Sequence, residues 1–398
     1  MIIVALLKGV PARTTRVVTV SGVLKREEMD IVMNPNDVKA IEAADYVKRR
    51  AGGKVVALTM GPDVKLAPIM NGLYDSQVEG VDEAVILSDR RMAGADTLAT
   101  AYTVSLGVKN VLDTNKNAVD QLIDLIESAV EKRVLFTKAK ELYDANLIPN
   151  KIFSSLPAVK QTIIYEYFSG RLSKNDAISK LQEFRESLAN FLIVTGVKTT
   201  DGETGSVGPQ TAEALSDLFG FLVPHITYVH DFEIEPTNNL VLAERKISRI
   251  IQVLEARFPI LLTISPEYRS RVAPAGFKKG VRENNYRGKI RQIVKRDATV
   301  IGADLRRIGL PGSPTLVGPG VDIGRPLSQK ILGRTLIFRG KVEPLSWDGR
   351  AYGPFQPGDR VEGLPDDLQR DFMERGLIQA FGYQDLLTEL FGDLNASR

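Results

Sequence analysis

The chain has 398 residues, of which 43% are apolar and 25% charged, and its 52 Lys and Arg nearly balance its 49 Asp and Glu. This composition is typical of a globular protein, and a net charge of +3 gives no general attraction to nucleic acid or anionic lipid. The absence of cysteine excludes disulfides, thiol nucleophiles and cysteine-ligated metal centres, and two histidines, His225 and His230, are too few for a histidine-built metal site.

The chain opens with an apolar segment, Met1–Leu7, that is too short to cross a bilayer. No basic residue precedes this segment and no small-residue cleavage pattern follows it, so we expect neither a targeting segment nor a membrane span. A continuous apolar run of this length is typical of a buried strand, which we predict at Ile2–Leu7. The expected location is the cytoplasm, with a peripheral position at a membrane through partners left open.

Strand and helix patterns alternate in the first third of the chain. A helix predicted at Asn36–Arg50 stops before two glycines, and a second helix is predicted at Asp96–Leu106. The alternation predicts βαβ units and a mostly parallel sheet. The further strands expected in this sheet are Val55–Met60, Ala84–Leu87, Phe191–Thr195 and His225–Val229.

The predicted fold is α/β, with a mostly parallel sheet, a helical insertion and a C-terminal arm. Residues 117–190 show helical patterns and no clear strand, so they divide the α/β domain into parts 1–116 and 191–322. The second part includes a hairpin, the strand Ile260–Ile264 and a loop-like basic stretch, Tyr268–Arg296. Residues 323–398 are expected to be an extension rather than an independent domain.

The strongest site signal follows the strand predicted at Phe191–Thr195, in a Gly/Ser/Thr-rich loop that leads into a helix. Ligands of open α/β sheets bind beyond the carboxyl ends of strands, and a glycine-rich loop before a helix N-terminus suits a phosphate or pyrophosphate. The loop matches neither the Walker motif nor GxGxxG, and a plain glycine-rich turn is the alternative. The candidate residues are Asp201, Gly202, Glu203, Thr204, Gly205, Ser206, Val207, Gly208, Pro209 and Gln210.

Other segments of the chain also contribute candidate residues. Asp96 begins a helix, where it would serve equally well as an N-cap, and Asn34 offers an amide that suits an adenine edge or ribose. A lysine at a strand end, such as Lys8, is usually only solvated. We predict no catalytic residue or metal ligand, and we expect both histidines to be structural. The further cofactor-binding candidates are Leu6, Gly9, Asp37, Met60, Thr97 and Thr100.

Taken in order, these segments resemble the β subunit of electron transfer flavoproteins. The family patterns VAVKxVPD, MNPxDExAxEEA and ALxMGP correspond to VALLKGVPA (Val4–Ala12), MNPNDVKAIEAA (Met33–Ala44) and ALTMGP (Ala57–Pro62). LSDxxFAGADTLATA and GxxxxDGDTxxVGPxxAE correspond to segments Leu87–Ala101 and Gly196–Glu213. Later elements are RKI (Arg245–Ile247), FPILLT (Phe258–Thr263) and IGLPGSPT (Ile308–Thr315).

The resemblance implies an adenine-nucleotide-binding fold that holds either FAD or, as a structural nucleotide, AMP. DGETGSVGPQ (Asp201–Gln210) is similar to the DGDTxxVGP of the electron-bifurcating, FAD-binding, Fix-type group rather than to the DDDCNQTGQ of the AMP form. In that group the FAD accepts a hydride from NADH. One electron then passes to the FAD of the α subunit, and the other passes to a low-potential iron–sulfur acceptor.

The resemblance also implies partners: the α subunit, a quinone-oxidoreductase-like flavoprotein and a ferredoxin-like iron–sulfur protein. The family's recognition loop corresponds to Tyr268–Arg296, which has ten Lys and Arg and the single acid Glu283. A surplus of positive charge steers acidic partners, and we expect Arg269, Arg271, Lys278 and Lys279 to bind a partner. Aromatic residues between the basic ones would also suit nucleic acid, but the balanced net charge and the lack of an RNA-binding signature disfavour that function.

Overall fold

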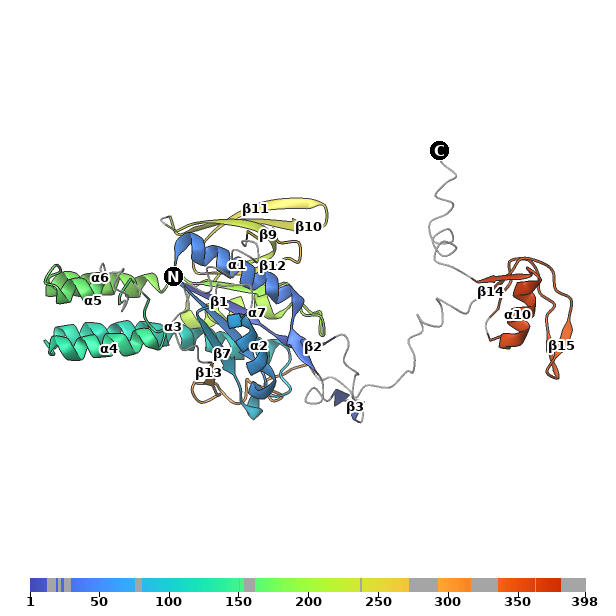
Figure 1. Cartoon of the computed structure of the whole chain (residues 1–398), viewed down its shortest axis with the longest axis horizontal. Coiled ribbons are helices and arrows are strands. Elements are labelled where there is room, and N and C mark those ends of the chain that lie inside the picture. Colours follow the sequence, from blue (N-terminus) through green and yellow to red (C-terminus); the bar gives the residue numbers. More distant parts are fainter. Residues whose placement is uncertain are drawn as a thin grey trace. The chain divides into compact units, whose positions relative to one another are not determined.

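The computed structural model describes residues 1–12, 19–20, 23–24, 30–75, 81–149, 151–153, 162–236, 238–271, 293–315, 336–361 and 363–380. The chain divides into two compact units, the first containing most of residues 1–318 and the second most of the remainder. The first unit carries the large sheet of Figure 1, and the second carries a small sheet and the helix α10. Within the described ranges, no helix combines the length and the apolar character that crossing a membrane requires.

The first unit is built on a nine-stranded sheet with the order β11-β10-β9-β12-β8-β1-β6-β7-β13. From β9 to β13 neighbouring strands are parallel, and only the β9–β10–β11 part is antiparallel, so the predicted mostly parallel α/β fold is confirmed. The strands are β1 (Ile2–Leu7), β6 (Lys54–Met60), β7 (Glu83–Leu87), β8 (Leu192–Gly196), β9 (His225–Glu235), β10 (Leu240–Ile247), β11 (Ile250–Arg257), β12 (Ile260–Ile264) and β13 (Ile293–Arg296).

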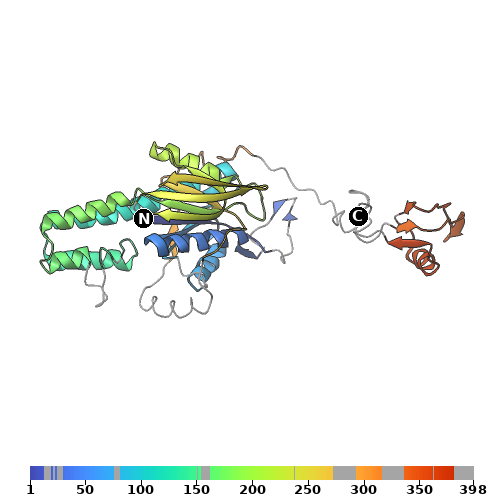
Figure 2. The same ribbon diagram turned by 90° about the horizontal axis from the view of Figure 1, so that it is seen from above.

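Helices cover both faces of this sheet (Figures 1 and 2). All side chains of the central strand β1 are buried, as expected for a parallel strand with both faces covered. Ile3 and Ala5 of β1 pack in the core beneath α1 (Pro35–Ala51) and α2 (Asp63–Asp75). The alternate residues of β1 pack in the other core, with α3 (Thr97–Glu127) and α7 (Val207–Phe219).

The order of the strands creates a switch point between β1 and β8. From β1 the chain proceeds to β6 and β7 on one side, and later returns to β8 and β12 on the other side of β1. The loops after β1 and β8 therefore lead in opposite directions. Open α/β sheets bind their ligands at such a switch point. Beside this edge the short strand β2 (Gly9–Pro11) pairs with β5 (Ile31–Met33). The strands β3 (Thr19–Val20) and β4 (Val23–Leu24) form a separate two-stranded sheet.

The expected helical insertion extends from one end of the sheet (green in Figures 1 and 2). It consists of the end of α3 with α4 (Lys132–Asp144), α5 (Ile163–Phe168) and α6 (Lys174–Ser187). Residue 117, the expected start of the insertion, lies inside α3, because one buried apolar stripe continues from Val111 through Val119 to Ile126. The helix predicted at Asp96–Leu106 is therefore the first part of a much longer one.

The prediction of a loop over Tyr268–Arg296 is wrong for its last four residues, because Ile293–Arg296 forms the strand β13. This strand pairs in parallel with β7 at the edge of the sheet. An edge strand of four residues with two basic side chains has too little apolar alternation to be found from the sequence.

The second unit differs from the expected arm, because its described residues form a compact structure with a core of its own. Phe338 stacks on Phe355 at 4.2 Å between ring centroids and meets Phe372 edge-on at 5.5 Å. Its strands are too short for periodicity to reveal them. The elements are β14 (Leu336–Phe338), β15 (Leu345–Trp347), β16 (Arg350–Tyr352), β17 (Arg360–Val361), α10 (Asp366–Glu374) and β18 (Ile378–Ala380).

One buried carboxyl group joins the start of α1 to both strands of the switch point. Asp37 accepts hydrogen bonds from the backbone N–H of Lys8 at 2.8 Å and of Gly196 at 3.2 Å, and from Nδ2 of Asn34 at 2.9 Å. Lys8 follows β1 and Gly196 ends β8. Burial raises the pKa of Asp37 to about 7, although the three donors act in the opposite direction. A Cβ at position 196 would lie 2.5 Å from Oδ1 of Asp37, so this close approach requires glycine.

The first turn of α7 packs directly on the sheet through Gly208. A Cβ at this position would lie 2.5 Å from Cγ2 of Thr263 in β12 and 3.5 Å from Cγ2 of Thr195 in β8. The absence of a side chain at Gly208 therefore allows the helix to approach the two strands.

We predict that Gly208→Ala lowers the free energy of unfolding by about 1–3 kcal/mol, because the added methyl group overpacks the contact with Thr263. The second substitution Thr263→Ser removes the opposing methyl group and should recover most of the loss. Gly202→Ala is the matched control, because the nearest atom to its Cβ would be 3.8 Å away. Denaturant unfolding measures all four proteins, and an unchanged stability of Gly208→Ala would contradict the packing argument.

We predict that Asp37→Asn destabilises the fold by about 1–3 kcal/mol, since an amide nitrogen would face a backbone donor that now has an acceptor. The folded-state pKa of Asp37, about 7, lies above the unfolded value of about 4. Its contribution to stability is therefore complete below pH about 4 and is lost as the pH rises through about 7.

In Asp37→Asn, the loss of unfolding free energy between pH 5 and pH 8 should accordingly be smaller than in the wild type. Urea unfolding at the two pH values measures this difference. Asp113→Asn, which removes an exposed i,i+4 partner of Lys109 on α3, is the control and should keep the wild-type difference. An equal pH dependence in Asp37→Asn and the wild type would show that Asp37 does not titrate in this range.

Candidate functional site

The candidate site lies at the edge of the sheet where the parallel strands β1, β6, β7 and β8 end. Parallel strands have their carboxyl ends on the same side, so Lys8, Met60 and Gly196 share this edge. The helices α2, α3 and α7 follow β6, β7 and β8 and therefore begin at this edge. The helix α1 begins here as well, because Asp37 in its first turn contacts Lys8 and Gly196. Their N-termini carry partial positive charge, which favours an anionic ligand.

The structure brings Lys8 and Asp201 together across the switch point. Nζ of Lys8 lies 2.9 Å from both carboxylate oxygens of Asp201, joining the end of β1 to the loop after β8. The Asp201 side chain is 14% exposed and the Lys8 side chain 42%. Burial acts to raise the pKa of Asp201, but hydrogen bonds from Lys8 and Thr199 and the charge of Lys8 outweigh it and hold the pKa below its ordinary value.

Two asparagines hold the same loop from the start of α1. Nδ2 of Asn34 donates to the carbonyl of Lys198 at 3.1 Å, and Nδ2 of Asn36 donates to the same carbonyl at 2.7 Å. Asn34 is fully buried, and its Oδ1 has no hydrogen-bond partner among the residues that the structure describes. Lys8, Asn34, Asp37 and Asp201 thus form one connected group, with a buried acceptor suited to a ligand N–H or O–H.

The start of α7 is open to an anion. Glu203 and Gly205 have left-handed backbones with φ of 51° and 66°, which turn the loop before the helix. Ser206, the N-cap residue, makes no side-chain capping hydrogen bond, and its own N–H donates to Oγ1 of Thr204 at 3.4 Å. The first-turn N–H groups therefore have no side-chain acceptor at the N-cap, and the hydroxyls of Thr204 and Ser206 lie in the same loop.

The start of α3 is different, because a side chain of the protein itself accepts hydrogen bonds from its first-turn N–H groups. Asp96 accepts from the N–H groups of Leu98 and Ala99 at 3.0 Å each, so it is the N-cap of α3. Its other oxygen accepts from the N–H of Thr315 at 3.1 Å, and its own N–H donates to Oγ of Ser313 at 2.8 Å. These are the contacts of an N-cap, which is the alternative role that the sequence offered for Asp96. Thr97 and Thr100 follow it in α3 and are half-buried.

A cleft of about 490 Å³ opens between the first turns of α3 and α7 and the segment 306–314. Gln210 of α7 lines it together with Tyr102 of α3, and Oε1 of Gln210 is buried without a hydrogen-bond partner in the described part of the chain. The guanidinium of Arg307 lies over the Tyr102 ring at 4.0 Å from its centroid. Residues 306–314 were not predicted as site residues, although the match of IGLPGSPT to the family pattern was the available signal.

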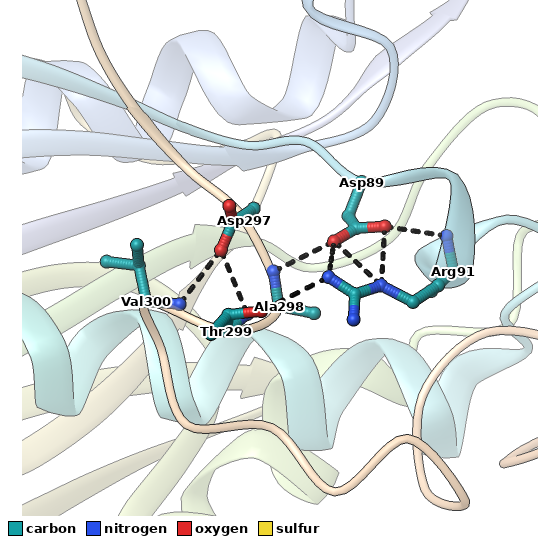
Figure 3. Close-up of polar contacts among 6 residues, drawn as sticks. All are labelled: Asp89, Arg91, Asp297, Ala298, Thr299 and Val300. Atoms are coloured by element: carbon teal, nitrogen blue, oxygen red, sulfur yellow. Dashed lines mark hydrogen bonds and ion pairs between the residues drawn. The ribbon is translucent and has the colours of Figure 1, made fainter.

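Contacts at the end of β7 position the chain that leads into this segment (Figure 3). Asp89 accepts from the N–H of Ala298 at 3.1 Å and from Nη2 of Arg91 at 2.5 Å. Arg91 also donates to Oγ1 of Thr299 at 3.3 Å. The hydrogen bonds from Arg91 hold the pKa of Asp89 well below its usual range, so this junction stays ionised at neutral pH. It fixes the segment after β13 beside the start of α3.

The remaining candidates have packing roles in the structure. Leu6 is buried in the core, and Met60 packs against that core from the end of β6. A Cβ at Gly9 would lie 2.7 Å from side-chain atoms of both Ile31 and Leu66.

The two histidines lie within β9 rather than beside it. Nδ1 of His230 is 3.1 Å from the carbonyl of Glu244. Burial, with a contribution from the charge of Arg245, lowers the pKa of His225 to about 4. In the ranges that the structure covers, no three acidic or histidine side chains gather in a way that would hold a metal ion.

The candidate partner-binding residues fall into two kinds. Arg269 is 66% exposed and lies 4.0 Å from Asp231. Arg271 is 34% exposed, donates to Asp231 at 2.7 Å and to the hydroxyl of Tyr46 at 3.0 Å, and lies over the Tyr46 ring. Arg271 is thus engaged within the chain, whereas Arg269 is more accessible. Lys278 and Lys279 lie outside the described residues.

Comparison with known proteins points to one family. Residues 21–113 match the family model of the electron transfer flavoprotein domain. Over 314 residues the chain is 27% identical to protein FixA of Bradyrhizobium diazoefficiens, covering 78% of each chain. It is 28% identical to the electron transfer flavoprotein subunit beta of Thermoanaerobacterium thermosaccharolyticum, covering 80% of this chain and 86% of the relative.

A third relative is the caffeyl-CoA reductase-Etf complex subunit CarD of Acetobacterium woodii, which is 26% identical over 62% of this chain and 61% of its own length. Over most of its length the chain is thus similar to beta subunits of electron transfer flavoproteins.

Proposed function

We propose that this chain is the FAD-binding beta subunit of an electron-bifurcating electron transfer flavoprotein. The observation that carries the proposal is the start of α7, where a Gly/Ser/Thr loop leads into a helix that its N-cap side chain does not cap. Backbone N–H groups and hydroxyls in this arrangement suit a pyrophosphate. The loop carries the sequence DGETGSVGPQ, which resembles the FAD-binding form of the family.

The donor set at this edge fits an adenine nucleotide. The loop from Thr204 to Gly208 would hold the phosphates, and the unpaired Oδ1 of Asn34 would accept a hydrogen bond from the nucleoside part. Asp96 would act indirectly, because its capping hydrogen bonds fix the start of α3 beside the loop. When bound, FAD supplies hydride acceptance from NADH and the division of two electrons between the α-subunit FAD and a low-potential iron–sulfur acceptor.

Relatives named FixA and a subunit of a caffeyl-CoA reductase-Etf complex support the bifurcating assignment. The electron transfer flavoprotein alpha subunit is the first partner that beta-subunit family membership implies. We further propose a quinone-oxidoreductase-like flavoprotein and a ferredoxin-like iron–sulfur protein as the later acceptors. AMP is the alternative nucleotide, because a helix N-terminus with hydroxyl donors also suits a single phosphate.

Cofactor analysis of the complex purified with its alpha subunit tests the assignment. We expect one FAD per beta chain in addition to the FAD of the alpha subunit, and no AMP after denaturation and separation of the released nucleotides. Bleaching by NADH in the absence of air should affect the flavin of the beta chain. Release of AMP with flavin only in the alpha subunit would establish the non-bifurcating alternative instead.

Arg269 and Arg271 differ in exposure, so we propose that Arg269 docks the partner and that Arg271 has a structural role. We predict that Arg269→Ser slows association with the redox partner at low salt and that the difference from the wild type disappears as ionic strength rises. Arg271→Ser should instead lower stability, because it removes contacts with Asp231, Glu233 and Tyr46. Stopped-flow electron transfer and thermal unfolding separate the two effects, and an equal association rate for Arg269→Ser and the wild type at low salt would remove its docking role.

A further inference from the structure

We infer that Lys8 is a charge-compensating residue of the nucleotide site: it neutralises Asp201, and thereby allows a loop rich in acids to accept a phosphate. The inference rests on the proposed nucleotide binding at α7 and adds a role for one ion pair within it. Lys8 is a positioning residue in this account, acting on the ligand through Asp201 rather than by contact with the phosphate.

The loop between β8 and α7 contains more acid than base. Residues Val197–Ser206 include Asp201 and Glu203 but only one basic residue, Lys198. A phosphate at the start of α7 would therefore approach a loop of net negative charge, and like charges at this range repel. Lys8, which comes from the end of β1, supplies the second positive charge.

The negative charges of Asp201 and Glu203 are neutralised to different degrees by nearby lysines. Asp201 is 14% exposed and has Nζ of Lys8 at 2.9 Å from both oxygens. Glu203 is 63% exposed, and its closest contact with Lys198 is 3.6 Å. Water screens an exposed carboxylate well, whereas a largely buried one acts more strongly on a neighbouring ligand. Asp201 is therefore the carboxylate whose neutralisation matters most.

Hydrogen bonds fix both the backbone and the ammonium group of Lys8. Its backbone N–H donates to the buried Asp37, which fixes the start of the side chain, and its ammonium group is shared by the two oxygens of Asp201. The carbonyl of Lys198, in the same loop, is held by Asn34 and Asn36. The loop thus has a defined position relative to β1, so the charge of Lys8 is applied at a fixed place.

A double-mutant cycle distinguishes compensation from direct contact with the phosphate. The variants are Lys8→Gln, Asp201→Asn and Lys8→Gln/Asp201→Asn in the full chain, and calorimetry measures the Kd for FAD and for AMP at low salt. We expect Lys8→Gln to weaken binding about tenfold, which corresponds to about 1.4 kcal/mol. Asp201→Asn should bind at least as tightly as the wild type, and the double variant should return to within about twofold of it.

Three further variants control the cycle. Lys8→Arg keeps the charge and should retain binding, which separates loss of charge from loss of folding in Lys8→Gln. Lys198→Gln, which affects the exposed pair of the same loop, should have a smaller effect than Lys8→Gln. Lys140→Gln removes an exposed i,i+4 pair with Asp144 on α4 and should leave the Kd unchanged.

The outcomes separate this inference from the proposed function. If the double variant binds as weakly as Lys8→Gln, Lys8 contacts the phosphate itself and the compensation role is overturned. Unchanged binding by Lys8→Gln overturns it as well, and in both cases the nucleotide-binding function stands. A wild-type chain that binds neither FAD nor AMP, alone or with its alpha subunit, overturns the proposed function and this inference with it.

Discussion

The buried carboxyl group of Asp37 is the contact on which the site depends. Its two oxygens accept from groups on β1, on the start of α1 and on β8. β1 and β8 are neighbours in space but are separated by most of the first unit along the chain. The ionised carboxylate suits the three N–H donors at this position because it offers only acceptors. The loops after both strands consequently leave the sheet in fixed positions.

Three of the helices that start at this edge, α1, α3 and α7, are used in different ways. α1 begins at the Asp37 junction, and α3 is capped by Asp96, so both are satisfied by the chain itself. α7 has no capping side chain, and its first turn reaches the sheet through Gly208. The fold therefore presents one helix N-terminus for a ligand and uses the other two to position the surrounding segments. This contrast assigns the phosphate to α7 more specifically than the presence of glycines does.

The two ends of the first unit carry different features. The carboxyl edge of the sheet holds the charged and polar groups of the site, including the Lys8–Asp201 pair. The insertion formed by α4, α5 and α6 lies away from it and is held together mainly by apolar and aromatic contacts, such as that of Phe136 with Phe153 at 5.1 Å. The second unit has its own core, centred on Phe338 and Phe372. Changes in either of these parts therefore need not alter the polar contacts of the site.

The sequence alone predicted the features that depend on local pattern. The apolar run at Ile2–Leu7, the glycines after α1 and the alternation of strands and helices were sufficient for the parallel sheet, and the ordered motifs were sufficient for the family. The short strands of the second unit and β13 were missed, because a strand of two to four residues has no readable period.

Only the tertiary structure decided what the candidate residues do. Gly208 and Gly9 are candidate cofactor-binding residues in the sequence, and the structure adds that neighbouring side chains lie where a Cβ would be. The sequence gives no reason to distinguish Arg271 from Arg269, but in the structure only Arg271 contacts both Tyr46 and Asp231. The pairing of Lys8 with Asp201 joins residues 193 positions apart. Local pattern records which groups a segment offers, whereas the partner of each group is set by the packing of strands and helices distant in the chain.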